Sequence, residues 1–213
     1  MKIRSYILLI LTISFISFSN AQIRVGIQGG LNIASFTIPN NLISNAERNS
    51  LLAFSIGGIG ELAVSNLFYL QIEPRYIQKG FITEISEFAG TSKSTESVNY
   101  FELPLYIKAK FCTKNFQPFI LVGPNFGFLL SASEEATLFT GQTLPKLDTK
   151  VNYKSYDLAI DFGVGVEYVL TEVLSLHSSV RYSLGIANVY DIPTYDYKTR
   201  GIQIYIGILY GFN

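Results

Sequence analysis

Charged side chains recur at every second position in several stretches of this chain, and they are the residues that could do chemistry. Lys108 and Lys110, for example, stand two residues apart, so in a β-strand both point to the same face. Charges gathered on one buried face must find partners. The predicted interior polar network consists of Glu73, Arg75, Glu102, Lys108, Lys110, Asp157, Asp161, Glu167, His177 and Arg181.

His177 is the only histidine of the chain and the one candidate for a catalytic base. Asp161 or Glu167 could orient it, and Ser175 or Ser179 could act as a nucleophile. Both serines lie two residues from the histidine on the same expected strand, so the three side chains point in parallel, which is poor geometry for attack. We therefore expect a packed, hydrogen-bonded histidine, and a chain that is not an enzyme.

Neither a metal nor an organic cofactor is expected. The single histidine and the single cysteine, Cys112, are far apart and meet no zinc-site spacing. The glycine-rich stretches 26–30 and 57–60 are not followed by a helix pattern, as a phosphate-binding loop requires. Glycine in these stretches instead lets strands curve and twist.

The elements that must position the charged residues are β-strands. From Tyr156 to Tyr168, aromatic and aliphatic side chains alternate strictly with Asp, Gly, Ala and Glu, a period of two that no helix matches. The same pattern, less clean in the second and fifth stretches, predicts eight strands over residues 23–33, 51–64, 70–76, 103–111, 119–130, 153–170, 174–184 and 202–212. Pro74, Pro104 and Pro124 interrupt them, so bulges or exits from the bilayer are expected there.

The connections between these strands alternate between short and long. Tight turns are expected at Ser65-Asn66, at Thr113 to Asn115 and at Thr171-Glu172. Long polar loops are expected over residues 37–50, 84–99, 131–152 and 188–199. Three turns and four loops are typical of an all-β, antiparallel up-and-down barrel with both termini on the short-turn side.

The distribution of large side chains favours a transmembrane barrel over a soluble one. A soluble barrel of the lipocalin kind turns its apolar face inward, but the large Ile, Phe and Tyr side chains here exceed what an eight-stranded interior could hold. Outward aromatic residues also recur near the strand ends, as in the two girdles of membrane barrels. One girdle comprises Phe68, Phe111, Tyr168, Tyr210 and Phe212, and the other Tyr76, Phe101, Phe128 and Tyr156.

The first residues have the pattern of an export sequence. A basic start, an apolar run over residues 6–18 and small residues up to Ala21 predict a signal peptide over residues 1–21, followed by a barrel domain over residues 22–213. Loss of Lys2 and Arg4 leaves 14 basic residues against 16 acidic ones. This near-neutral balance argues against nucleic acid or an anionic membrane surface as a partner, and one cysteine allows no internal disulfide.

Several motifs together resemble the PorT-like outer-membrane β-barrel family of Bacteroidetes. They are Gly26 to Asn32, Leu70 to Tyr76 followed by Gln78-Lys79-Gly80, Tyr100 to Leu105, Gly123-Pro124, Gly163 to Glu167 and Arg181 to Ile186. The resemblance spans the whole expected mature chain. It implies localisation in the cell outer membrane, contact with its lipid bilayer and an architecture in which the prolines belong to the design.

Three functions from different classes remain open at this point. The first is a non-enzymatic scaffold or interaction component of the bacterial envelope, linked to secretion or surface assembly, that meets protein partners through its loops or periplasmic turns. The second is a small channel for ions or solutes along the inward charges. The third is an enzyme centred on His177.

Overall fold

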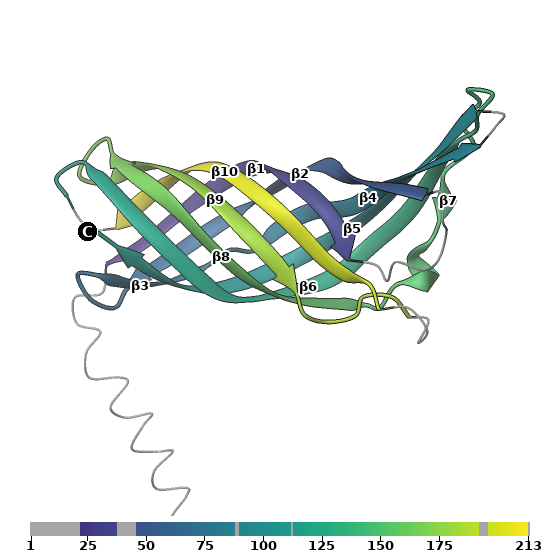
Figure 1. Ribbon diagram of the computed structural model, residues 1–213. Helices are drawn as coiled ribbons and strands as arrows, with labels where there is room; N and C mark the ends of the chain where they lie inside the picture. Colours follow the sequence, from purple (N-terminus) through teal and green to yellow (C-terminus); the bar gives the residue numbers. More distant parts are fainter. Residues whose placement is uncertain (1–21, 38–45, 88–89, 112, 192–195, 213) are drawn as a thin grey trace, which may run out of the picture.

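The strands close into a ring of eight in the computed structural model (Figure 1). The structure describes residues 22–37, 46–87, 90–111, 113–191 and 196–212, so the expected signal peptide and Cys112 lie outside these ranges. Its elements are β1 (Ile23–Thr37), β2 (Ala46–Ala63), β3 (Phe68–Ile72), β4 (Arg75–Glu87), β5 (Gly90–Lys110), β6 (Phe116–Thr137), β7 (Leu147–Asp148), a 3-10 turn (Lys150–Asn152), β8 (Tyr156–Val169), β9 (Leu174–Gly185) and β10 (Lys198–Phe212).

The ring closes between the first and last strands, which pair antiparallel from Ile23↔Phe212 to Thr37↔Lys198. The strands β3 and β4 together fill one place in the wall, because both pair with β2 on one side and β5 on the other. Closure leaves no sheet edge in the barrel wall, as the hydrocarbon of a bilayer requires. The predicted eight-stranded up-and-down barrel is confirmed.

The proline prediction holds at one position of the three. Pro74 lies in the break between β3 and β4, where its carbonyl accepts the Gly58 amide at 2.9 Å. Pro104 and Pro124 lie inside β5 and β6. The described bulge in the pairing of these two strands is at Asn99/Tyr100. A proline can be kept in such a wall where its carbonyl still accepts a bond, as that of Pro104 does from the Glu73 amide.

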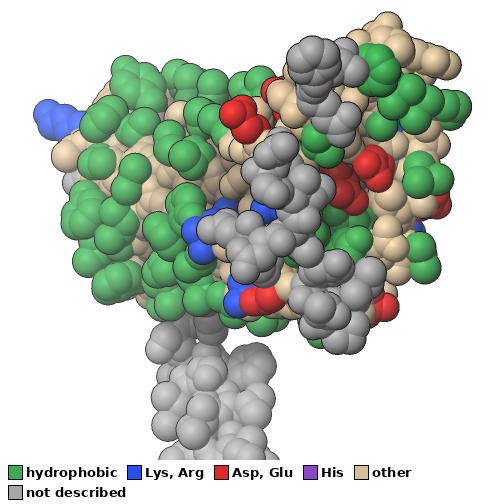
Figure 2. All heavy atoms as spheres, turned by 45° about the vertical axis from the view of Figure 1, so that its right-hand side comes forward, with side chains coloured by type: hydrophobic (Ala, Val, Ile, Leu, Met, Phe, Trp, Pro, Cys, Tyr) green, Lys and Arg blue, Asp and Glu red, His purple; other side chains and the backbone are tan. Residues whose placement is uncertain are grey.

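Alternating burial confirms which face of each strand points inward. Along β10, Gln203, Tyr205 and Leu209 are buried, whereas Ile204 and Ile206 between them are exposed. The exposed positions form a belt of aliphatic and aromatic side chains around the wall (Figure 2). This arrangement, polar inside and apolar outside, is that of a membrane barrel. No helix among the described residues is long and apolar enough to cross a membrane.

The three tight turns lie where the sequence predicted them, but two of the long loops are wrong for much of their length. Residues 84–99 are mostly strand, because β4 continues to Glu87 and β5 begins at Gly90. In the same way β6 continues to Thr137, well into the expected loop 131–152. The loop expected over residues 37–50 is shorter too, since β2 begins at Ala46.

These extensions build a sheet that projects from one side of the barrel, at the upper right of Figure 1. It consists of residues 46–50, 81–87, 90–97 and 131–137, paired in that order. We call it the extracellular sheet, since the termini and tight turns of outer-membrane barrels face the periplasm. It continues the wall on one side only.

Candidate functional site

The interior of the barrel gathers the charged residues that the sequence placed on one strand face. Twelve charged side chains of the described residues are buried there, none more than 8% exposed. Six are acidic and six are basic, so their formal charges cancel. They are Arg24, Glu61, Glu73, Arg75, Lys79, Glu102, Lys108, Lys110, Asp157, Asp161, Glu167 and Arg181.

At the periplasmic end, two carboxylates are shared among three cations. Arg24 lies 2.9 Å from Glu61 and 2.7 Å from Glu167. Lys110 lies 2.9 and 2.8 Å from the same two carboxylates. Lys108 contacts both as well, at 2.7 Å from Glu61. Removing either carboxylate would leave several buried cations with half of their compensation.

The middle of the barrel is held by two arginines. Arg75 lies 2.6 Å from Glu102 and 3.1 Å from Asp161, and Arg181 pairs with Glu73. Tyr rings flank both guanidinium groups: that of Arg181 stands 4.7 Å from the centre of the Tyr205 ring, and that of Arg75 stands 5.4 Å from it. Ion pairs and cation–π contacts together compensate the charges that the bilayer keeps from water.

Toward the extracellular end the polar network finishes at Lys79, which lies 2.9 Å from Asp157 and 2.6 Å from Glu102. Above it the barrel is closed by apolar side chains. This outer-mouth cluster consists of Ile77, Val98, Tyr100, Ala132, Tyr153 and Val189, all buried. Tyr190 and Tyr197, from the loop expected over residues 188–199, pack against the cluster. Tyr195 lies outside the described residues.

His177 is 1% exposed and lies between the periplasmic and central groups of charges. Its Nδ1 is 3.8 Å from Glu167, its Nε2 is 3.4 Å from Arg181, and its ring stacks on Phe119 at 5.1 Å. Ser179 accepts a hydrogen bond from Arg181 at 3.1 Å and is itself buried. The histidine therefore packs among charged groups in the barrel interior.

All ten residues of the predicted network are buried inside the barrel, and nine of them form ion pairs with opposite charges there. Sequence reasoning missed Arg24, Glu61 and Lys79. Each lies in phase with inward residues of its own strand, as Arg24 does with Gln28. Period two carried to the strand ends would have found Arg24 and Lys79, whereas Glu61 lies in a stretch with apolar residues on both faces. Among the described residues no cluster of His, Cys, Asp or Glu could hold a metal ion.

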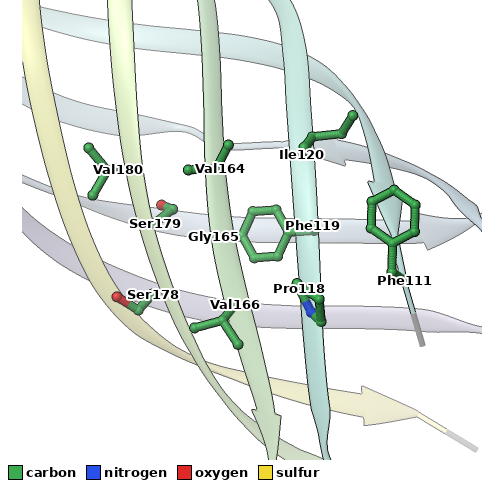
Figure 3. Close-up of a pocket in the computed structure, with 10 residues that line it drawn as sticks. All are labelled: Phe111, Pro118, Phe119, Ile120, Val164, Gly165, Val166, Ser178, Ser179 and Val180. Carbon is green, nitrogen blue, oxygen red and sulfur yellow. The ribbon is translucent and has the colours of Figure 1, made fainter. Parts of the chain in front are cut away.

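A hollow opens on the outer wall of the barrel (Figure 3). Its sides are the outward side chains of Ile120, Val164 and Val180, and its floor lies at Gly165, beneath which the ring of Phe119 reaches. The lining is almost wholly apolar and lies within the hydrophobic belt. Such a hollow accommodates lipid hydrocarbon.

Solved structures of similar fold are outer-membrane proteins. Neisserial surface protein A (NspA) is 14% identical over 91% of this chain and 100% of its own, with a TM-score of 0.52. OprG from Pseudomonas aeruginosa is 12% identical over 91% and 95% of the two chains, with a TM-score of 0.50. The outer membrane protease OmpT from Escherichia coli is 10% identical over 92% and 99%, with a TM-score of 0.53. At these identities the likeness concerns the fold alone.

None of the curated proteins compared with the chain matches it in sequence. A family model does: the model of the outer membrane protein beta-barrel domain covers residues 18–191. Together with the closed ring, the inward charges and the apolar belt, this match places the protein in the outer membrane of the bacterial envelope. The chain belongs to the outer membrane protein β-barrel domain family.

Proposed function

We propose that this outer-membrane barrel is a non-enzymatic scaffold of the envelope, which anchors the extracellular sheet for contacts with protein partners in secretion or surface assembly. The observation that carries the proposal is the filled interior. Twelve compensated charges and the outer-mouth cluster occupy the space that a channel or a catalytic site would need. A barrel filled in this way serves as an anchor for what it presents outside.

The extracellular sheet supplies a surface suited to that role. It is held rigid by strand pairing from Lys93↔Thr137 down to the barrel wall. At its outer end Phe139 is 54% exposed and Leu144 is 39% exposed. Large apolar side chains on a rigid support, surrounded by polar residues, are the usual centre of a protein interface.

Site-specific crosslinking in intact cells tests the scaffold. A photo-reactive amino acid replaces Phe139 at the end of the sheet, and in a matched variant it replaces Val164, which faces lipid in the belt. We expect reproducible protein adducts from position 139 and only lipid adducts from position 164. Lipid or no adducts from both positions would refute the scaffold.

A small channel is the second candidate, favoured by the mixed charges along the interior. Recordings from planar bilayers decide it, because a filled barrel conducts no more than the bare bilayer. A variant with Tyr100→Ala and Tyr153→Ala removes the largest side chains of the outer-mouth cluster and serves as an opened control. Steady conductance of the unaltered protein would show that the barrel is a channel and would contradict the scaffold function.

We also propose that the barrel catalyses no reaction on lipid or peptide. The support is the burial of His177 and the engagement of Ser179 with Arg181. If purified protein does hydrolyse a lipid or peptide substrate, His177→Ala identifies whether this centre is responsible. Activity lost in that variant, with folding retained, would overturn the proposal.

A further inference from the structure

A short segment beside the barrel mouth exposes apolar and basic side chains together. In residues 146–154, Thr149 and Tyr153 are buried against the barrel, whereas Leu147 is 63% and Val151 is 82% exposed. The segment is fixed in place, because the Thr149 amide donates to the Ala132 carbonyl at 3.1 Å and the Lys154 amide donates to Val189 at 2.8 Å. Its outward side chains are therefore presented by a rigid backbone.

Three lysines accompany the two apolar side chains. Lys146 and Lys150 are exposed and Lys154 is half-buried. The ion pairs found on the outside of the described chain are Lys93–Glu84 and Lys198–Asp196, and none involves these three lysines. The neighbouring carboxylate of Asp148 accepts the Lys150 backbone amide at 2.9 Å. The ammonium groups of this segment are therefore available to bind anions.

The segment lies close enough to the bilayer for its side chains to reach the lipid headgroups. Ala132, which holds Thr149, stands four residues beyond Phe128 of the outer aromatic girdle on β6. At about 3.3 Å per residue and a tilt of about 40°, this places Thr149 about 10 Å above the girdle. The polar layer of a bilayer begins at the girdle and is about 5 to 8 Å deep on each side, so Thr149 lies just above it, and a lysine side chain there is long enough to reach back into it. Lys150 and Val151 follow directly, above the exposed Leu130 and Tyr156 of the hydrophobic belt.

We propose that residues 146–154 form a docking surface for anionic lipid headgroups of the outer leaflet. The ammonium groups of Lys146, Lys150 and Lys154 bind lipid phosphates, while Leu147 and Val151 enter the interface beneath them. Continuity with the lipid-facing belt and charge complementarity select this occupant over a protein. The inference goes beyond the scaffold proposal and depends only on the placement of the barrel in the membrane.

The chain contains no tryptophan, which allows a direct test. Val151→Trp introduces a single fluorophore at an exposed position, and Phe139→Trp places one at the end of the extracellular sheet as a matched control. Both proteins are folded into vesicles of phosphatidylcholine and phosphatidylglycerol that carry brominated acyl chains. We expect emission from position 151 to shift to shorter wavelength and to be quenched, and emission from position 139 to stay unquenched.

The charge requirement is tested in the same background. Changing all three lysines to alanine should abolish most of the quenching at position 151, and changing them to arginine should retain it. Vesicles of phosphatidylcholine alone should give weaker quenching than the anionic ones. A water-like, unquenched emission from position 151 in anionic vesicles would overturn the docking surface, as would equal quenching with and without the lysines.

Discussion

The two halves of β5 differ although they belong to one continuous strand. From Tyr100 to Lys110, inside the bilayer, buried and exposed side chains alternate almost without exception. From Gly90 to Asn99, in the extracellular sheet, most side chains are only partly buried and the alternation fades. The backbone pairing with β6 runs through both halves, with a bulge at Asn99/Tyr100 and a gap between Pro104 and Ile107.

The difference shows what each solvent demands of a strand. Hydrocarbon penalises every outward charge and every unpaired backbone group, so the inner half must segregate its side chains. Water makes no such demand of the outer half, where an exposed charge costs little. Removing a charge from the barrel interior should therefore lower the free energy of unfolding strongly, whereas removing an exposed charge from the extracellular sheet should change it little.

The strongest test of this difference removes one carboxylate from each region. Glu167→Ala takes away the shared partner of Arg24, Lys108 and Lys110. We expect the free energy of unfolding to fall by about 3 to 5 kcal/mol, because buried cations lose their compensation. Urea unfolding in lipid vesicles measures the change.

The matched control is Glu84→Ala, which breaks the exposed pair with Lys93 at 3.8 Å. Here the expected loss is within about 1 kcal/mol, since water already solvates both partners. Losses of equal size in the two variants would mean that the interior pairs contribute no more than surface ones.

A second contrast places a new charge outside the strand wall in each region. Val164 is 59% exposed within the belt, so Val164→Arg should cost about 2 to 4 kcal/mol if it faces the middle of the bilayer. Leu147→Arg, at an exposed site beyond the belt, should cost about 0 to 1 kcal/mol. The same vesicle assay reads both, and equal tolerance of arginine at the two sites would contradict the inside and outside assignment.

The same solvent difference explains how far the sequence could predict the molecule. The bilayer requires polar and apolar side chains to lie on opposite faces of each strand. This alternation allowed the eight strands, and inward residues such as Asp161 and Arg181, to be predicted from the sequence. Glu61 escaped because apolar residues occupy both faces of its stretch, as Ile59 and Leu62 show. The inward orientation of Phe119, which stacks on His177, could not be predicted for the same reason.

The extracellular sheet could not be predicted from its residues alone. Residues 90–97 are rich in Ser and Thr, a composition shared by solvated loops. What makes them strand is pairing with Phe81–Glu87 and Ser131–Thr137, whose ends are fixed by the barrel below. Such long-range pairing leaves little trace in a local pattern. The precise ion-pair partners inside the barrel likewise depend on strand register.

The smallest expected effect concerns one titrating carboxyl group within the extracellular sheet. Glu96 on β5 stands directly opposite Glu134 on β6. Burial, and secondarily the charge of Glu134, raises the pKa of Glu96 above its ordinary value of 4.5, although hydroxyl groups of Tyr153 and Thr149 partly offset this. The folded sheet then binds more protons than the unfolded chain just above pH 4.5, so this contribution to stability is complete below that pH and is lost as the pH rises through the raised pKa.

Hydrogen exchange measured by mass spectrometry, read in peptides from residues 90–97 and 131–137, tests this carboxyl group. Glu96→Gln removes the titration, so at pH 7 the variant should exchange more slowly than the unaltered protein, and the difference should shrink toward pH 4. Glu84→Gln, on the neighbouring strand and partly exposed, serves as the control and should change exchange equally little at both values. A difference between Glu96→Gln and the unaltered protein that stays constant with pH would show that Glu96 does not titrate in the sheet, and that its side chain acts there through packing alone.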